Sequence, residues 1–246
     1  MSEQKSGDLK GFYLVLGSVA VIAVGAIGWT FLKTTLSSAA TEPILEIVTG
    51  ELTDIQALVD MATGVERGNP DAPITIMEFA DYQCPACQQF ATLVKPEVDL
   101  AYIETGMVRF VFHDFPLGGH PHAFLAARAA RCALDQGQEY YWPYHDQLFG
   151  HQSTWAVSQA PPFNAFETYA ATIGMNEDDF GACLNSDLHA DVVSANMRLG
   201  MELGVTGTPT LYASKGGGRA TRIARWGEFS GVQEVVDQLM GEDETN

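Results

Sequence analysis

Two cysteines separated by two residues could carry out redox chemistry in this chain. The segment Cys84-Pro85-Ala86-Cys87 lies between an apolar, β-branched run and a segment with helical spacing, which predicts that Cys84 stands at the start of a helix. The positive end of the helix dipole and the unpaired N–H groups there favour the thiolate, which is the reactive form of the sulfur. A thiol with a lowered pKa is also a good leaving group, so the disulfide of this pair would be oxidising. Pro85 suits the first helical turn, where no N–H is needed.

The same cysteine pair has two other interpretations. A zinc site would need two further ligands, and the remaining cysteines, Cys132 and Cys183, lie in predicted helices with no second Cys-x-x-Cys motif. A purely structural disulfide between Cys84 and Cys87 would add little stability, because the loop that it closes is so short. The spacing therefore favours a redox-active pair that works without a metal or another cofactor.

The elements that must position this pair follow from hydrophobic patterning. Strands are expected at 74–79 and 107–112, with a helix over 85–104 between them that Pro96 should bend. A block of helices follows, and we expect them at 123–136, 140–149, 163–173, 177–184 and 188–203. The chain then returns to two strands, at 209–213 and 222–226, which a glycine-rich turn joins, and it closes with a helix over 232–240.

Two motifs resemble those of the DsbA-like thiol:disulfide oxidoreductases, in particular their membrane-anchored BdbD-type branch. The first is the turn cluster GNPDAP at 68–73 followed by EFADYQCPAC, and the second is GVTGTPT at 204–210, which is similar to the cis-proline loop of that family. The resemblance covers about residues 68–240. It implies an α/β thioredoxin fold with an inserted all-helical subdomain at about 114–204.

The resemblance also implies roles for individual residues. Cys84 would be the exposed nucleophile and Cys87 its buried partner. Pro209 would have a cis peptide bond to Thr208 and pack against the active disulfide, and the backbone of Thr208 would pair with an extended substrate chain. An ordinary proline at the start of a strand is the alternative for Pro209.

Glu78 lies six residues before Cys84 and matches the buried acid of the family. A carboxyl group inside that strand would have a raised pKa and could relay the proton that Cys87 gains or loses. The alternative is a solvated glutamate at the edge of the sheet.

Ala86 departs from the best-known DsbA proteins, which carry Pro-His between their cysteines. A histidine there adds a charge that stabilises the thiolate, whereas alanine does not, so we expect a weaker oxidant. The resemblance implies an oxidase of unfolded or reduced extracytoplasmic proteins, with a membrane quinone-linked thiol oxidase as its redox partner. A reductase or isomerase using the same site is an alternative, and so is a non-catalytic binding or chaperone module. The intact cysteine pair speaks against the last of these.

Cys132 and Cys183 are the other two cysteines, and some DsbA-like proteins carry a second disulfide in the helical block. Pairing of these two is therefore expected, with two buried free thiols as the alternative. Four polar residues in one stretch could be mistaken for a metal cluster, but they match a family segment that links strand to helices. We expect structural roles for these residues, which are His113, Asp114, His120 and His122.

An uncharged apolar run from Gly11 to Leu32 is long enough to cross a bilayer. Lys5 and Lys10 precede it and only Lys33 follows closely, which predicts a cytoplasmic N-terminus and a periplasmic or cell-surface main domain. The run is longer than the apolar part of an ordinary signal peptide, so an uncleaved anchor is favoured. The small residues at 38–40 (SAA) offer a cleavage site as the alternative.

The formal net charge of −18 argues against binding to nucleic acid or to anionic lipid headgroups, because the acidic residues are scattered along the chain. The expected organisation is a cytoplasmic segment (1–10), an anchor (11–32), a linker (33–67) with one short helix around 52–62, a catalytic domain (68–240) and an acidic tail (241–246).

Overall fold

A five-stranded mixed sheet forms the centre of the structure, a computed structural model that describes residues 55–241. The strand order is β1-β3-β2-β4-β5, so β2 is the central strand. β2 runs parallel to β3 and antiparallel to β4, and the edge strands β1 and β5 are antiparallel to their neighbours. The strands are β1 (Val65–Arg67), β2 (Ile74–Ala80), β3 (Val108–Asp114), β4 (Thr210–Lys215) and β5 (Thr221–Arg222).

The central position of β2 explains its composition. Its sequence ITIMEFA is almost continuously apolar, as a strand covered on both faces requires. Ile74 and Ile76 are fully buried, and so is Phe79. The one acidic residue of the strand, Glu78, is therefore placed inside the core, in register with Phe112 of β3 and Leu211 of β4.

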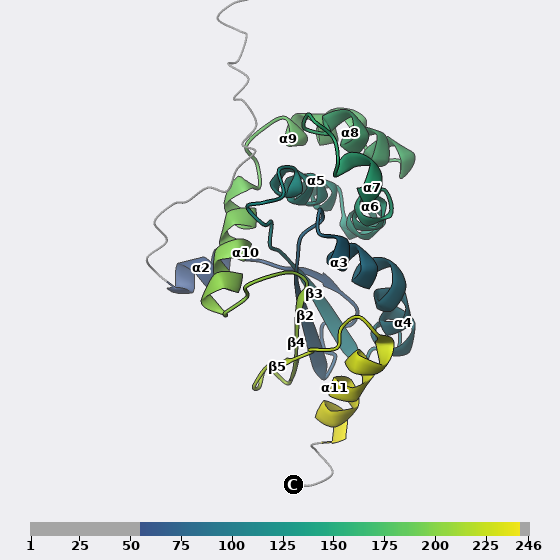
Figure 1. Ribbon diagram of the computed structural model, residues 1–246, viewed down its shortest axis with the longest axis vertical. Helices are drawn as coiled ribbons and strands as arrows, with labels where there is room; N and C mark the ends of the chain where they lie inside the picture. Colours follow the sequence, from purple (N-terminus) through teal and green to yellow (C-terminus); the bar gives the residue numbers. More distant parts are fainter. Residues whose placement is uncertain (1–54, 242–246) are drawn as a thin grey trace, which may run out of the picture. The chain divides into compact units, whose positions relative to one another are not determined.

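Helices cover both faces of the sheet (Figure 1). On one face α10 (Ala190–Glu202) contacts β3, and α2 (Ile55–Met61) packs on α10. On the other face α11 (Phe229–Gly241) contacts β4 and also α4 (Lys95–Val98), which belongs to the long helical segment that follows β2. This segment begins at the cysteine pair, so the sheet and its helices together fix where the pair lies.

The helix expected over 85–104 changes its hydrogen-bonding pattern three times. α-Helical and π-helical stretches alternate without a break: α3 (Pro85–Gln89), η1 (Phe90–Val94), α4 (Lys95–Val98) and η2 (Asp99–Ile103). Pro96 stands in the first turn of α4, directly after η1. A proline lacks the N–H that a regular α-helix would need at this point, and the wider π-turn before it accommodates the missing bond.

The helical insertion lies between β3 and β4, beyond one end of the strands (Figure 1). Its core is rich in aromatic side chains, and Tyr141, Tyr144, Phe166 and Phe180 are all fully buried. The insertion thus shares one continuous hydrophobic core with the sheet. Its helices before α10 are α5 (Ala123–Asp135), α6 (Gln138–Gly150), α7 (Gln152–Trp155), α8 (Phe163–Thr172) and α9 (Glu177–Leu184). The expected fold, a thioredoxin-like α/β domain with a helical insertion, is confirmed for the described residues.

Two parts of the sequence prediction need correction. The segment expected as a linker also contains β1, which pairs with β3 as an edge strand, and the short helix expected around 52–62 is present as α2, whose Leu58 is buried against α10. β1 is only three residues long, too short to show a period in the sequence. The strand expected at 222–226 is reduced to β5, since the chain turns away after Arg222.

Within residues 55–241, no helix is both long and apolar enough to cross a membrane. The anchor expected at 11–32 lies outside the described residues, as do the expected cytoplasmic segment and most of the acidic tail.

Candidate active site

Cys84 is the N-cap residue of α3, and Pro85 follows it in the first turn. Its backbone is extended, with φ −78° and ψ 123°, so the chain leaves β2, turns and enters the helix at this residue. The side chain is 7% exposed, whereas Cys87 is 0% exposed. Both are free thiols. The helix start that the sequence predicts is therefore present, with only the first sulfur within reach of solvent.

The two sulfurs have opposite acid–base properties. The pKa of Cys84 falls from 9.0 to about 5, mainly because the Cys87 thiol donates to its sulfur, and the backbone N–H groups of Cys87 and Ala86 add to this effect. Burial alone would raise the pKa of Cys84. Burial raises the pKa of Cys87 well above its ordinary value, and the bond that it donates to Cys84 adds to the rise. At neutral pH the pair is therefore one thiolate and one thiol.

The loop that precedes β4 faces Cys84. The Thr208–Pro209 peptide bond is cis, as the resemblance implies. The Cys84 sulfur lies 3.4 Å from the carbonyl oxygen of Thr208, to which it donates a hydrogen bond when protonated. The backbone of Thr208 thus lies directly beside the reactive sulfur, where an extended chain bound to this loop would bring its own sulfur close to Cys84.

Glu78 is buried, with 1% exposure, and no residue of the described chain forms a hydrogen bond with either of its carboxylate oxygens. The pKa of this carboxyl group is raised to about 8, mainly by burial. The charge of Lys95 partly offsets this rise, and the charge of Cys84 adds to it. Glu78 in turn raises the pKa of Cys87. Glu78 therefore holds a proton at neutral pH, and its charge is coupled to those of both cysteines.

Glutamines that sequence analysis did not identify hold the cysteine loop in place. The side-chain amide of Gln152 donates to the carbonyl oxygens of Tyr82 and Cys84, at 2.7 and 3.0 Å. Gln83 donates to the carbonyl oxygen of Ala156 at 2.8 Å and accepts from the N–H of His122 at 2.8 Å. No short motif reports these contacts, because each joins residues far apart in the sequence.

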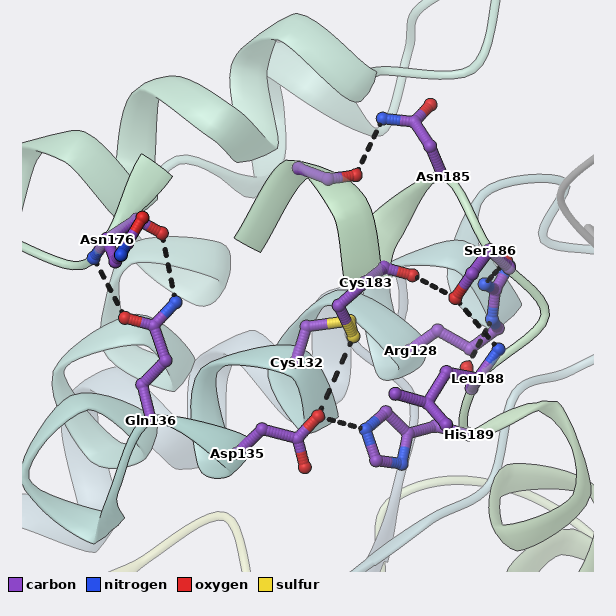
Figure 2. The surroundings of a disulfide bond; sticks show 11 residues. Arg128, Cys132, Asp135, Gln136, Asn176, Cys183, Asn185, Ser186, Leu188 and His189 are labelled. Atoms are coloured by element: carbon purple, nitrogen blue, oxygen red, sulfur yellow. Dashed lines mark hydrogen bonds and ion pairs between the residues drawn. A yellow bond between two sulfur atoms is a disulfide. The ribbon is translucent and has the colours of Figure 1, made fainter. Parts of the chain in front are cut away.

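Cys132 and Cys183 form a disulfide that joins α5 to α9, with a Cα–Cα distance of 5.8 Å (Figure 2). This is the pairing expected for the helical block. Asp135 and His189 lie next to the bond, and the His189 Nε2 atom is 2.7 Å from the Asp135 Oδ2 atom. Cys132, Cys183 and His189 form the one group among the described residues that could hold a metal ion, but the two sulfurs are bonded to each other.

The polar stretch after β3 does not converge on one point. His113 bonds to Asn196, and Asp114 forms an ion pair with Arg131 at 2.7 Å. His122 Nε2 lies 2.9 Å from the carbonyl oxygen of Ser158. These three residues thus have separate structural partners, whereas His120 bonds to Asp81 beside the cysteine loop.

The site and the fold agree with what comparison with known proteins shows. A family model described as Thioredoxin matches residues 60–222. The chain belongs to the thioredoxin family. The match contains both cysteines of the site and the Thr208–Pro209 loop.

The similarity extends to disulfide-forming members of this family. Disulfide bond formation protein D of Bacillus subtilis is 24% identical over 171 residues, which cover 70% of this chain and 74% of that protein. The crystal structure of oxidised BdbD from Bacillus subtilis matches with a TM-score of 0.65 at 22% identity, covering 74% of this chain and 94% of that chain. Wolbachia pipientis alpha-DsbA1 matches with a TM-score of 0.66 at 25% identity, covering 73% and 92%. This thioredoxin-family chain is a DsbA-like thiol:disulfide oxidoreductase.

Another group of relatives matches only in part. The Na(+)/H(+) antiporter NhaA 3 of Salinispora tropica is 31% identical over 162 residues, which cover 65% of this chain but 23% of the antiporter. The chain therefore spans about a quarter of the length of such relatives.

Proposed function

We propose that this protein is an oxidase that introduces disulfides into extracytoplasmic proteins through Cys84 and Cys87. The observation that carries the proposal is the difference between the two sulfurs. With a pKa of about 5, Cys84 is a thiolate at neutral pH, which stabilises the reduced enzyme relative to its disulfide. A disulfide whose reduced form is stabilised in this way tends to accept electrons.

The exchange proceeds in two steps. A substrate thiolate attacks the Cys84 sulfur of the Cys84–Cys87 disulfide, the sulfur–sulfur bond of the enzyme breaks, and Cys87 leaves and takes up a proton. A second substrate thiolate then attacks the substrate sulfur of the mixed disulfide and releases Cys84 as a thiolate. The substrate loses two electrons and the enzyme gains them.

Three residues support these steps. Glu78 supplies the proton that Cys87 takes up, because its pKa of about 8 keeps it protonated at neutral pH and its charge acts on Cys87. Thr208 offers backbone groups to an extended substrate beside Cys84, and Pro209 directs the chain into β4 after this contact. No cofactor takes part in this scheme beyond the redox-active cysteine pair.

The location and the redox partner belong to the same proposal. The uncharged run at 11–32 would anchor the protein in the membrane. Its N-terminus would then lie in the cytoplasm and its catalytic domain outside. A persistent disulfide between Cys132 and Cys183 suits an oxidising compartment. A quinone-linked thiol oxidase in the membrane would remove the electrons that the cysteine pair collects.

Exchange with a reduced, unfolded protein tests the proposal. The oxidised enzyme should form disulfides in this substrate, and Cys84→Ser should abolish the reaction. Cys87→Ala, with Cys84 first converted to its mixed disulfide by glutathione disulfide, should exchange glutathione for substrate and accumulate Cys84–substrate mixed disulfides, because Cys87 is not there to attack them and return the substrate thiol. The double variant Cys132→Ala/Cys183→Ala is the control and should remain active. A reduction potential near that of thioredoxin, about −270 mV, would contradict an oxidase and favour a reductase.

A further inference from the structure

Asp81 lies at the centre of the active-site loop and contacts both cysteines through its backbone. Its N–H donates to the Cys87 sulfur at 3.5 Å, and its carbonyl oxygen accepts from the N–H of Cys84 at 3.0 Å. Its side chain is completely buried. The buried carboxylate therefore belongs to the residue whose backbone bonds to both cysteines.

The carboxylate of Asp81 is bound on both oxygens. Oδ1 accepts from the N–H of Gln83 at 2.6 Å, and Oδ2 accepts from the N–H of Leu117 at 2.8 Å. Oδ2 also lies 2.7 Å from Nδ1 of His120, whose side chain is 27% exposed. His120 is thus the one ionisable side chain among the described residues that forms a hydrogen bond with this carboxylate.

A negative charge at Asp81 opposes formation of the Cys84 thiolate, because like charges in a buried site repel. A protonated His120 cancels that charge, so the field of the helix start can act on Cys84 without this opposition. Proteins with a histidine between the two cysteines supply a cation at that point, whereas this chain carries Ala86. His120, on the loop that follows β3, is placed to supply such a cation.

We propose that His120, held in place by Asp81, is a positioning residue that keeps Cys84 ionised by neutralising the buried carboxylate. This inference deepens the proposed function and rests on it, since it assumes that Cys84 is the nucleophile.

The acid–base properties of the site agree with this role. The pKa of His120 is raised, first by its hydrogen bond to Asp81 and further by the charges of Asp81 and Cys84, while burial acts in the opposite direction. The titratable groups around the site are then His120, Asp81, Cys84 and Cys87, with Glu78 acting from β2. Between the pKa of Cys84, about 5, and that of His120, the thiolate and the imidazolium are present together.

Replacement of His120 by a neutral and by a cationic side chain tests the proposal in the full-length protein. His120→Asn keeps an amide N–H close to the position of Nδ1 but removes the charge. The pH at which Cys84 is half-alkylated should rise by about one unit. A rise of about one unit in the pKa of a single thiol corresponds to about a tenfold shift of the equilibrium with glutathione towards the oxidised enzyme. His120→Lys restores the charge and should keep both values near those of the wild type.

The control is another histidine–aspartate pair in the same chain. His189 Nε2 lies 2.7 Å from Asp135 Oδ2 beside the second disulfide, so His189→Asn removes a similar contact away from the cysteine loop. It should leave the alkylation of Cys84 unchanged. Asparagine also tolerates the left-handed backbone of His189, φ 68°.

An unchanged midpoint of alkylation in His120→Asn would overturn the proposal, and so would a His120→Lys protein that shifts as far as His120→Asn. Thermal unfolding of the oxidised variants checks that each is folded. Failure of the proposed function is a separate result, because it would show as a wild-type enzyme that forms no disulfides although Cys84 still titrates with a low pKa.

Discussion

Glu78 occupies an environment in which its charged form is unstable. It belongs to the central strand, and neither carboxylate oxygen receives a hydrogen bond from any residue between 55 and 241. The charge of Lys95 lowers the pKa of Glu78, but burial outweighs this effect and brings the value to about 8. A glutamine would fill the same space without an ionisable proton, so the sequence maintains an acid here at the expense of stability.

The substitution Glu78→Gln should change the pH dependence of stability in the oxidised protein, in which Cys84 and Cys87 do not titrate. The folded pKa is raised from 4.5 to about 8, so between these values folded Glu78 keeps a proton that the unfolded chain releases. The stabilisation that comes from this retained proton is complete below the pKa of Glu78 in the unfolded chain. It is lost as the pH rises through the pKa of Glu78 in the folded protein. The free energy of unfolding of the wild type should therefore fall relative to Glu78→Gln by up to about 1.4 kcal/mol per pH unit.

Denaturant unfolding at several pH values between about 5 and 8 measures this difference. Glu97→Gln on α4 is the matched control, because it removes an exposed carboxyl group and shows any general effect of losing one negative charge. Parallel pH curves for the wild type and Glu78→Gln would mean that Glu78 is not protonated in the folded protein. The same variant should also slow the first exchange step, in which Cys87 leaves and takes up a proton.

Residue types and local spacing predicted part of this site, and tertiary contacts supplied the rest. Cys84, Pro85 and Cys87 were identifiable because a Cys-x-x-Cys pair at a helix start is a local pattern. Gln152 and His120 were not, because their partners lie 68 and 39 positions away in the sequence. A glutamine that donates to a backbone carbonyl has no signature until the fold brings the two together.

At the scale of the elements, the Cys132–Cys183 bond fastens α9 to α5 across 51 positions of the chain. Such a loop limits the freedom of the unfolded chain, so removing the bond should reduce stability by roughly 2–4 kcal/mol. Chemical denaturation of the Cys132→Ala/Cys183→Ala protein measures the loss. Cys132 is buried, and alanine fits its place without a clash. A stability equal to that of the wild type would show that packing alone holds α9.

The helix α10 approaches the sheet closely through Gly200. A Cβ atom there would lie 2.6 Å from the Phe115 ring and 3.0 Å from that of Phe79, closer than van der Waals contact allows. Gly200→Ala should therefore destabilise the protein by about 1–3 kcal/mol, although alanine favours helices. Gly181→Ala on α9 is the control, because its Cβ meets only Glu167 at 3.7 Å, and it should stabilise by about 0.5–1 kcal/mol. Thermal unfolding separates the two, and a stabilised Gly200→Ala protein would mean that α10 moves outward easily.

The long, periodic elements were predictable from sequence, and the short ones were not. The helices α5, α8 and α9 were expected within one residue of their ends, because apolar residues recur at helical spacing along them. α7 and β1 were missed, since four and three residues are too few for a repeating pattern to be recognised. β1 belongs to the sheet because β3 offers it a free edge, which is a property of the assembled fold.

At the scale of the whole domain, the helical insertion completes the active site as well as the core. Gln152 of α7 binds the carbonyl oxygen of Cys84, and Gln88 of α3 donates to the carbonyl oxygen of Phe149 at 2.8 Å. The start of α3 is thus held by β2 on one side and by α6 and α7 on the other. The position of the reactive sulfur therefore depends on how the insertion packs against the sheet, and mutations that loosen α6 or α7 should affect exchange before they unfold the sheet.

The attachment of this domain to a membrane is the last prediction, and it rests on the uncharged run at 11–32. A helix of that length and hydropathy partitions into the bilayer, and carbonate or high salt removes only proteins held by electrostatic contacts. The full-length protein should therefore stay in the membrane fraction after either wash, whereas a chain that starts at about Ser37 should be released and should still exchange disulfides. Mass analysis of the protein recovered from cells distinguishes this from the alternative. A mature form that begins near Thr41, after the small residues at 38–40, would show that the run is a cleaved signal, and the domain would then act without an anchor of its own.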